Sequence, residues 1–437
     1  MVALVTVFAF EGIATATAMP VVAEDLGLLE SYTWAFSAYF VASLLAIVVG
    51  GLWSDTEGPR RPIVAGAITL AVGSVVAGLA NGLVVLIVGR ALQGFGGGIL
   101  IVGLYVLIAR AFDVDTRPKA FSVLAAAWVV PSLVGPVVAG WLAQSVSWRA
   151  VFLLVPLVLL LPALLLFPRL RAYDGGTRPA GVRGRLTAAV VASLALLALQ
   201  GGLLEVSWPG GVLAAVGFVV MVVAVRRLLP AGSMRLRRGL PSSVMMRGFL
   251  AGAFASAEVF VPLALTQVRG LTVTQAGLIL AASALLWSVG SFVQGRLPGE
   301  DDRAGAVRLG AGLVTVGLLS LPLSLVGSLP PWIAVFSWAL TAFGMGLAVP
   351  SVSVQVMRLS APEALGANSS AIQVVDALGV TVAVSIAGFG HAFAVVMGGA
   401  TAGTYLLLWV GSALLGLLAV VFAGRMTPAS VRSTPSV

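Results

Sequence analysis

The most regular feature of the chain is the alternation of long apolar stretches with short polar gaps. Fourteen stretches carry about 20 mostly apolar residues each, the length that a helix needs to cross the hydrocarbon core of a bilayer. They cover approximately residues 2–22, 33–53, 62–81, 83–106, 118–142, 150–167, 186–204, 210–225, 244–266, 275–293, 304–326, 332–357, 365–389 and 401–423. We therefore expect an all-α integral membrane protein with 14 transmembrane helices.

The stretches form two groups of six with a pair between them. This grouping predicts a six-helix bundle over residues 1–168, cytoplasmic linkers flanking an inserted transmembrane hairpin over 169–243, a second six-helix bundle over 244–424 and a cytoplasmic tail over 425–437. The groups are weakly alike, since Gly51 and Asp55 align with Gly290 and Gln294. Repeated halves are a common plan of secondary transporters. We therefore expect two bundles in a pseudo-twofold relation.

Composition and charge placement support a membrane protein and predict its orientation. The chain is 59% hydrophobic and 9% charged, against about 25% charged in soluble proteins. If the N-terminus is cytoplasmic, 22 of the 25 Lys and Arg lie on that side, in the gaps, in the C-terminal tail or in the first residues of the adjoining spans, with Arg149 and Arg269 outside and Arg90 within a span. The positive-inside rule then predicts a multi-pass protein of a bacterial-type inner (plasma) membrane with both termini cytoplasmic. The net charge of +9 thus reflects orientation and indicates no nucleic-acid partner.

The residue inventory excludes several kinds of chemistry. With no Cys and one His, the chain offers neither a thiolate metal site nor a Cys nucleophile. Its only Lys, Lys119, follows a proline and not a glycine-rich loop, so no Walker A motif exists. We expect no catalytic residues, no metal and no cofactor, and we expect uphill work to draw on a proton gradient. An enzyme is disfavoured, whereas a receptor, a scaffold or a facilitator without proton coupling stays open.

The polar gap after the second apolar stretch carries a recognisable pattern. Glycines, an aspartate and two arginines follow the spacing G-x3-D-x2-G-x-R-R, at Gly51, Asp55, Gly58, Arg60 and Arg61. The pattern resembles the cytoplasmic loop signature of the major facilitator superfamily. The resemblance implies that Asp55 binds the end of a helix in the other half and acts as a conformational latch. Thr56 and Pro59 replace basic residues that are usual in the family.

Two further motifs lie inside the fourth and fifth stretches. Arg90-Ala-Leu-Gln93-Gly94 resembles the superfamily's R-x-x-q-G motif. The residues Pro131, Gly135, Pro136 and Gly140 resemble the GPxxGG signature of its antiporter branch. Pro136 and the small residues predict a kink between tightly crossing helices, although ordinary packing would use the same residues.

The motifs and the 14 spans together resemble drug/proton antiporters with two helices added between the halves. The resemblance extends over about residues 2–423. It implies that residues 186–225 form an inserted hairpin outside the core, and that the first, fourth, ninth and twelfth helices line the cavity.

The first stretch contains a glutamate near its centre. A charge at mid-membrane costs about 2.5–3.5 kcal/mol on insertion scales, so Glu11 is a candidate functional residue. Arg90 lies about 10 Å inside the outer end of its helix at 1.5 Å per residue. We expect Glu11 to carry the coupling proton while Arg90 favours its ionised form. A snorkelling Arg90 and a static buried ion pair are the alternatives, and the charge disfavours a signal peptide here.

The second half offers two more intramembrane acids, Glu258 and Asp376. Gln373 lies one turn before Asp376 and shares its helix face. The resemblance implies an acid at the position of Asp376 in antiporters that expel cationic drugs. We expect one of the two acids, either Glu258 or Asp376 with Gln373 beside it, to face the cavity as a substrate site or a second proton site. Five aromatic residues were candidates for a cavity wall: Trp128, Trp287, Trp338, Phe254 and Phe343.

The sequence as a whole favours one function and leaves a second open. It predicts a proton-coupled exporter, an antiporter of lipophilic small molecules with cationic compounds among the candidates, working by alternating access. An exporter of lipid or of a cell-envelope precursor is the alternative, because an apolar cavity would admit acyl chains. The expected partners are the small molecule or lipid, protons and membrane lipid, and the expected state is a monomer.

Overall fold

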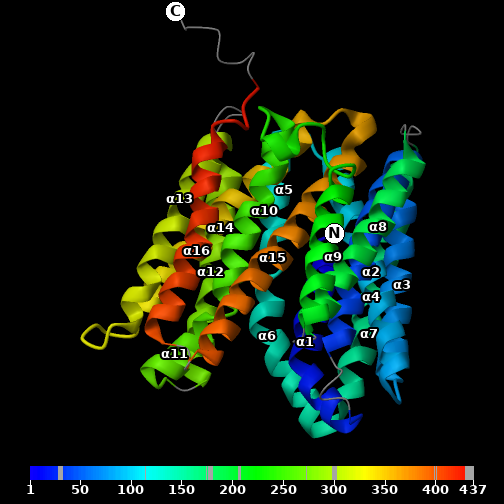
Figure 1. Cartoon of the computed structure of the whole chain (residues 1–437). Coiled ribbons are helices and arrows are strands. Elements are labelled where there is room, and N and C mark those ends of the chain that lie inside the picture. The colour runs from blue at the N-terminus through cyan, green and yellow to red at the C-terminus, as the bar shows by residue number, and fades with distance from the viewer. Residues whose placement is uncertain are drawn as a thin grey trace, which may run out of the picture. The chain divides into compact units, whose positions relative to one another are not determined.

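The protein is built from helices (Figure 1). The computed structural model describes residues 1–27, 33–113, 115–173, 175, 181–204, 208–271, 273–297, 303–397, 399 and 401–428. Within these ranges all regular structure is helical and no strand occurs. The predicted all-α fold class is therefore confirmed. The apolar composition sets this outcome, because a helix satisfies its backbone hydrogen bonds internally where lipid offers no partners.

One compact unit comprises Met1–Ala111, Val130–Ala231 and Ser360–Val374. Within it α2 lies beside α4 and α8, α4 lies beside α3, α8 pairs with α9, and α7 packs on α1 and α3 (Figure 1). Its helices are α1 (Val2–Asp25), α2 (Thr33–Glu57), α3 (Arg60–Gly78), α4 (Leu83–Ala111), α6 (Val129–Leu142), η1 (Ala143–Ser147), α7 (Trp148–Leu166), η2 (Phe167–Tyr173), α8 (Val182–Leu204), α9 (Trp208–Val225), η5 (Pro362–Ala364) and the beginning of α15 (Leu365–Val396).

The second compact unit comprises Phe112–Val129, Gly232–Leu359 and Val375–Val437. Within it α14 contacts α5, α10, α12 and α13, and α16 contacts α10 and α13. Its helices are α5 (Arg117–Ala126), η3 (Ser233–Arg235), α10 (Leu240–Glu258), α11 (Val261–Arg269), α12 (Val273–Arg296), α13 (Arg303–Ser320), η4 (Leu321–Leu325), α14 (Ile333–Leu359), the remainder of α15 and α16 (Ala402–Ala423). The bundle boundaries expected from the sequence stay a prediction.

Thirteen helical segments in the described part of the chain are long and apolar enough to cross a membrane. The fifth and sixth predicted spans fall together in one segment, Arg117–Leu166, of 50 residues. At 1.5 Å per residue it is about two and a half times as long as the approximately 30 Å hydrocarbon core requires. The protein is a multi-pass membrane protein, and the number fourteen stays a prediction.

Two predicted single helices are interrupted, each just before a proline. α5 ends at Ala126 and α6 begins at Val129, ahead of Pro131, while α10 ends at Glu258 and α11 begins at Val261, ahead of Pro262. Proline cannot donate to the carbonyl four residues back and its ring clashes with it. The fifth stretch therefore breaks upstream of the kink that we predicted at Pro136, through which α6 continues.

Glycines allow α4 to approach both of its neighbours closely. A Cβ atom at Gly94 would lie 2.1 Å from the carbonyl oxygen of Tyr39 in α2, and one at Gly96 would lie 2.3 Å from the backbone nitrogen of Leu70 in α3. These distances are far below van der Waals contact, so only glycine fits. The close packing fixes the height and rotation of α4, which carries Arg90 and Gln93.

The two arginines expected outside tie loop ends together. Arg149 donates to Asp25 (3.3 Å) and to the carbonyl of Ala80 (3.1 Å). Hydrogen bonds from the Trp148 indole and from Arg149 lower the pKa of Asp25. Arg269 at the end of α11 donates to three carbonyls around η4, those of Ser324, Val326 and Leu329. Both therefore have structural partners of their own.

Candidate functional site

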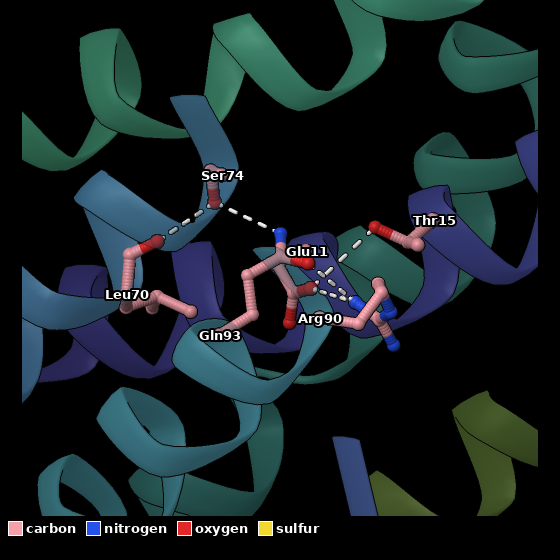
Figure 2. A network of polar contacts seen from close by, with 6 residues as sticks. All are labelled: Glu11, Thr15, Leu70, Ser74, Arg90 and Gln93. Atoms are coloured by element: carbon pink, nitrogen blue, oxygen red, sulfur yellow. Dashed lines mark hydrogen bonds and ion pairs between the residues drawn. The ribbon is translucent and has the colours of Figure 1, made fainter. Parts of the chain in front are cut away.

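Glu11 and Arg90 form a buried ion pair in the first unit (Figure 2). Arg90 Nη1 donates to Glu11 Oε1 at 2.9 Å, and the two side chains are 4% and 0% exposed. Thr15, one turn after Glu11, donates to the same oxygen at 3.5 Å. The structure thus brings together the two residues that the sequence analysis singled out in this half. Their role in proton coupling stays a prediction.

A polar chain continues from Arg90 into α3. Arg90 Nη1 also donates to Gln93 Oε1 (2.7 Å), and Gln93 Nε2 donates to Ser74 Oγ (3.0 Å), as Figure 2 shows. Ser74 in turn donates to the carbonyl of Leu70 at 2.9 Å. Gln93 lies three residues after Arg90, a spacing that places both on one helix face, so the motif itself could have revealed this contact. Ser74 gave no signal in the sequence.

The guanidinium of Arg90 also lies over an aromatic ring. Its Cζ atom is 4.4 Å from the ring centre of Tyr39 in α2, a cation–π contact that favours the charge where water is excluded. Sequence reasoning missed Tyr39, because its contact depends on how α2 packs against α4. α1 and α2 therefore contact Arg90 directly, and α3 contacts it through Gln93.

The ion pair is incompletely satisfied. Glu11 Oε2 and Arg90 Nε are buried and have no hydrogen-bond partner among the described residues, and an unpaired oxygen of a buried carboxylate is costly. A proton on Oε2 would neutralise the acid while Oε1 still accepts from Arg90. The geometry is therefore compatible with both protonation states of Glu11, which a proton carrier requires.

The antiporter-type motif in α6 packs in part against α1. A Cβ atom at Gly135 would lie 3.2 Å from Cγ2 of Ile13, two residues from Glu11. Pro131 is buried, whereas Pro136 is exposed and Gly140 has open space around its Cα. The motif thus contributes one close contact beside Glu11, and its Pro136 and Gly140 lie away from it.

Asp55 holds the first turn of α15. Its Oδ1 accepts from the backbone N–H of Gly366 at 2.6 Å and its Oδ2 from that of Ala367 at 2.8 Å. The first N–H groups of a helix have no partner within the helix and carry partial positive charge, so a carboxylate satisfies both needs. Gly51 permits the approach, since a Cβ there would lie 2.5 Å from the Gly366 carbonyl. We refer to Asp55, Gly366 and Ala367 as the Asp55 clasp.

The rest of the loop signature shapes the turn after α2. Gly58 has φ +85° and a Cβ there would lie 2.4 Å from the Tyr173 carbonyl, so the position requires glycine. Arg61 pairs with Glu57 at 2.6 Å on the surface, a contact worth at most about 1 kcal/mol. Arg60 begins α3. Gly58, Arg60 and Arg61 thus shape the loop between α2 and α3, whereas the contact with α15 depends on Asp55.

The second unit contains an ion pair that the sequence analysis did not foresee. Asp376 in α15 accepts from Nε of Arg247 in α10. The two helices cross closely here, because a Cβ at Gly379 would lie 2.3 Å from the carbonyl of Gly248. The charge count from the sequence places Arg247 among the cytoplasmic arginines, although it lies within the predicted span 244–266. No sequence spacing links Arg247 to Asp376.

The other polar residues proposed for the second half are not gathered with that pair. Gln373 Oε1 is buried, and no described residue forms a hydrogen bond with it. Glu258 ends α10 at the break before Pro262, and no ion pair or side-chain hydrogen bond to it occurs among the described residues. Within the described part of the chain, no three acids or histidines gather to hold a metal ion.

The aromatic residues give a mixed result. Phe254, one turn before Glu258, stacks on Trp338 at 4.8 Å between ring centres and meets Trp287 edge-on at 5.1 Å. Trp338 is fully buried and Trp128 is 41% exposed. Trp338 is therefore part of the packed interior and not a free wall residue, whereas Phe254 and Trp287 remain partly accessible.

Comparison with known proteins places this geometry in a family. The chain is 26% identical over 391 residues to the multidrug transporter protein MdtP of Bacillus subtilis, which covers 87% of this chain and 72% of that protein. It is 25% identical over 390 residues to multidrug resistance protein 3 of the same organism, with 87% and 76% covered.

The fold and the family agree with these relatives. The human organic anion transporter MFSD10 superposes with a TM-score of 0.71 at 15% identity, covering 97% of this chain and 98% of that one. The family model of the Major Facilitator Superfamily matches residues 1–384. The superfamily resemblance drawn from the loop and helix motifs is confirmed. The chain belongs to the Major Facilitator Superfamily and is a membrane transporter, not an enzyme.

Proposed function

We propose that this transporter is a proton-coupled exporter, an antiporter that moves lipophilic small molecules out of the cell by alternating access. The observation that carries the proposal is the buried Glu11–Arg90 pair, in which one carboxylate oxygen has no hydrogen-bond partner within the part of the chain that the structure describes. A buried ion pair is seldom the most stable choice for packing alone. A group that must lose and regain a proton explains why the charges are kept.

The substrate class is supported by two independent features. The relatives from Bacillus subtilis carry multidrug names, and the second unit has aromatic rings one turn from an intramembrane acid. Phe254 and Glu258 lie on one face of α10. Because Asp376 is already paired with Arg247 at the crossing of α10 and α15, Glu258 is the better candidate to meet a cationic substrate. Asp376 and Gln373, one turn apart in α15, are the other members of the proposed site.

The proposal includes a topology and a cycle. The charge distribution supports 14 spans with both termini in the cytoplasm of a bacterial-type inner membrane. The proposal takes these spans as two six-helix bundles with an inserted hairpin and the protein as a monomer. The Asp55 clasp acts as the latch of one conformational state. The proton gradient is the energy source.

The test compares Glu11→Gln with Glu24→Gln, an exposed acid on the same helix. Ethidium efflux is measured from proteoliposomes with an imposed proton gradient, with and without a protonophore. We expect the protonophore to stop wild-type efflux. We expect Glu11→Gln to bind ethidium and to exchange it down its own gradient while gradient-driven efflux stops, because glutamine keeps the shape of the side chain in the neutral state.

Three outcomes would contradict parts of the proposal. A well-folded Glu11→Gln protein that pumps at the wild-type rate refutes the proton-carrier role. A variant that folds poorly and melts early indicates a static ion pair, since removal of one buried partner costs about 3–5 kcal/mol. Transfer of a fluorescent phospholipid without ethidium efflux favours a lipid exporter instead.

A further inference from the structure

The inserted hairpin packs directly on the helix that carries Asp55. α8 and α9 lie against each other at glycines, since a Cβ at Gly202 would lie 2.5 Å from the backbone nitrogen of Ala214. α8 also lies along α2 (Figure 1), and a Cβ atom at Gly201 would lie 3.2 Å from the Trp34 ring. The hairpin is therefore part of the first unit and its first turn reaches the end of α2.

Arg185, in the first turn of α8, contacts the Asp55 clasp. Its Nη2 donates to the carbonyl oxygen of Ala367 at 3.4 Å, and Ala367 is the residue whose N–H donates to Asp55. Asp55 thus binds the backbone N–H of Ala367, and Arg185 binds the backbone carbonyl of the same residue. The bond is long, but the charges of Arg185 and Asp55 are close enough to interact directly.

The two cations that act on Asp55, Arg185 and Arg110, come from other helices and not from the loop signature. Asp55 is 1% exposed, and a buried carboxylate with two backbone hydrogen bonds is stabilised further by a cation nearby. The loop has Thr56 and Pro59 where basic residues are usual for its signature. Arg110 of α4 provides one charge, and it donates to the neighbouring Ser54 carbonyl at 3.3 Å. The hairpin provides the other.

We propose that Arg185 is a positioning residue of the latch, so that the inserted hairpin stabilises the state in which Asp55 binds the first turn of α15. The inserted helices α8 and α9 then have a function in the transport cycle, because they stabilise one of its conformational states. The proposal deepens the proposed function, on which its transport measurement rests, but its main test requires neither substrate nor proton gradient.

The test is hydrogen exchange of the full-length protein in detergent, followed on peptides that cover residues 362–372. Those peptides contain the two amides bound by Asp55. Loss of a hydrogen bond to a charged group predicts about tenfold faster exchange of these amides in Arg185→Gln. Arg185→Lys, which keeps the charge but not the fork of donors, should give a smaller increase.

Two comparisons separate positioning from general loosening. Arg183→Gln changes an exposed arginine in the same turn of α8 and should exchange like wild type. Asp55→Asn should speed exchange by itself, and adding Arg185→Gln to it should have a smaller effect than Arg185→Gln alone, because the carboxylate charge that Arg185 stabilises is already lost. In ethidium efflux, Arg185→Gln should lower the maximal rate several-fold with an unchanged KM.

Specific results would overturn the proposal. Wild-type exchange over residues 362–372 in both Arg185 variants excludes a role in the clasp. Faster exchange spread equally over α2 and α8 indicates a purely structural residue, as does an additive effect in the Asp55→Asn background. A failure of Glu11→Gln to stop proton-driven efflux would refute the proposed coupling and leave these exchange results unaffected.

Discussion

Asp55→Asn removes the acceptor geometry of the clasp while preserving its size. In the wild type both carboxylate oxygens accept, at 2.6 Å from Gly366 and 2.8 Å from Ala367. Asparagine has one acceptor oxygen and one donor amide. One backbone N–H of α15 therefore loses its acceptor and faces another donor.

The magnitude follows from these two bonds. A hydrogen bond to a charged group contributes about 1.5–3 kcal/mol, and a buried N–H without a partner costs about 1–3 kcal/mol. Together they weaken the clasp by about 2.5–6 kcal/mol, which corresponds to about two to four orders of magnitude in its equilibrium population at 1.4 kcal/mol per factor of ten. Asp55→Glu offers no rescue, because a Cβ at Gly366 would already lie 2.7 Å from Asp55 Oδ1 and no space exists for another methylene.

The assay measures ethidium transport and ethidium binding on the same preparation. We expect Asp55→Asn to lower the transport rate strongly while the dissociation constant changes little, because the clasp lies at the end of α2, several turns from the Glu11 level. An equal loss of binding and transport would refute the latch. Unchanged exchange of the amides of residues 366 and 367 would refute the hydrogen-bond reasoning.

Two further predictions concern packing in the membrane interior. Asp376→Asn and Arg247→Gln should each lower the melting temperature, by an amount that corresponds to about 1–3 kcal/mol of stability. The double variant should be more stable than the sum of the two losses predicts, and additive losses would show that the two side chains do not interact. Gly94→Ala should destabilise the fold by about 1–3 kcal/mol or more, because its Cβ meets the Tyr39 carbonyl. Gly140→Ala, where nothing lies within 4 Å, is its control and should melt like wild type.

The sequence alone was sufficient for the membrane class, the helical fold and the family. Each depends on information that is local along the chain. Apolar length decides whether a segment crosses a bilayer, and the spacing of Gly51, Asp55 and Gly58 decides which loop it resembles. Glu11 could be chosen because an intramembrane charge is costly wherever the rest of the chain lies. Pro131 and Pro262 indicated where the fifth and ninth predicted helices break, although the kink in the fifth was predicted at Pro136.

Only the tertiary structure decided which charges meet. Glu11 and Arg90 are 79 residues apart, Arg247 and Asp376 are 129 apart, and Arg185 and Ala367 are 182 apart. Such contacts depend on the rotation and height of each helix. Close helix crossings at glycines, such as that of Gly94 on Tyr39, determine both. A hydrophobic pattern fixes which residues are in the membrane but not which face of a helix is turned to which neighbour, because lipid and helix interior are equally apolar.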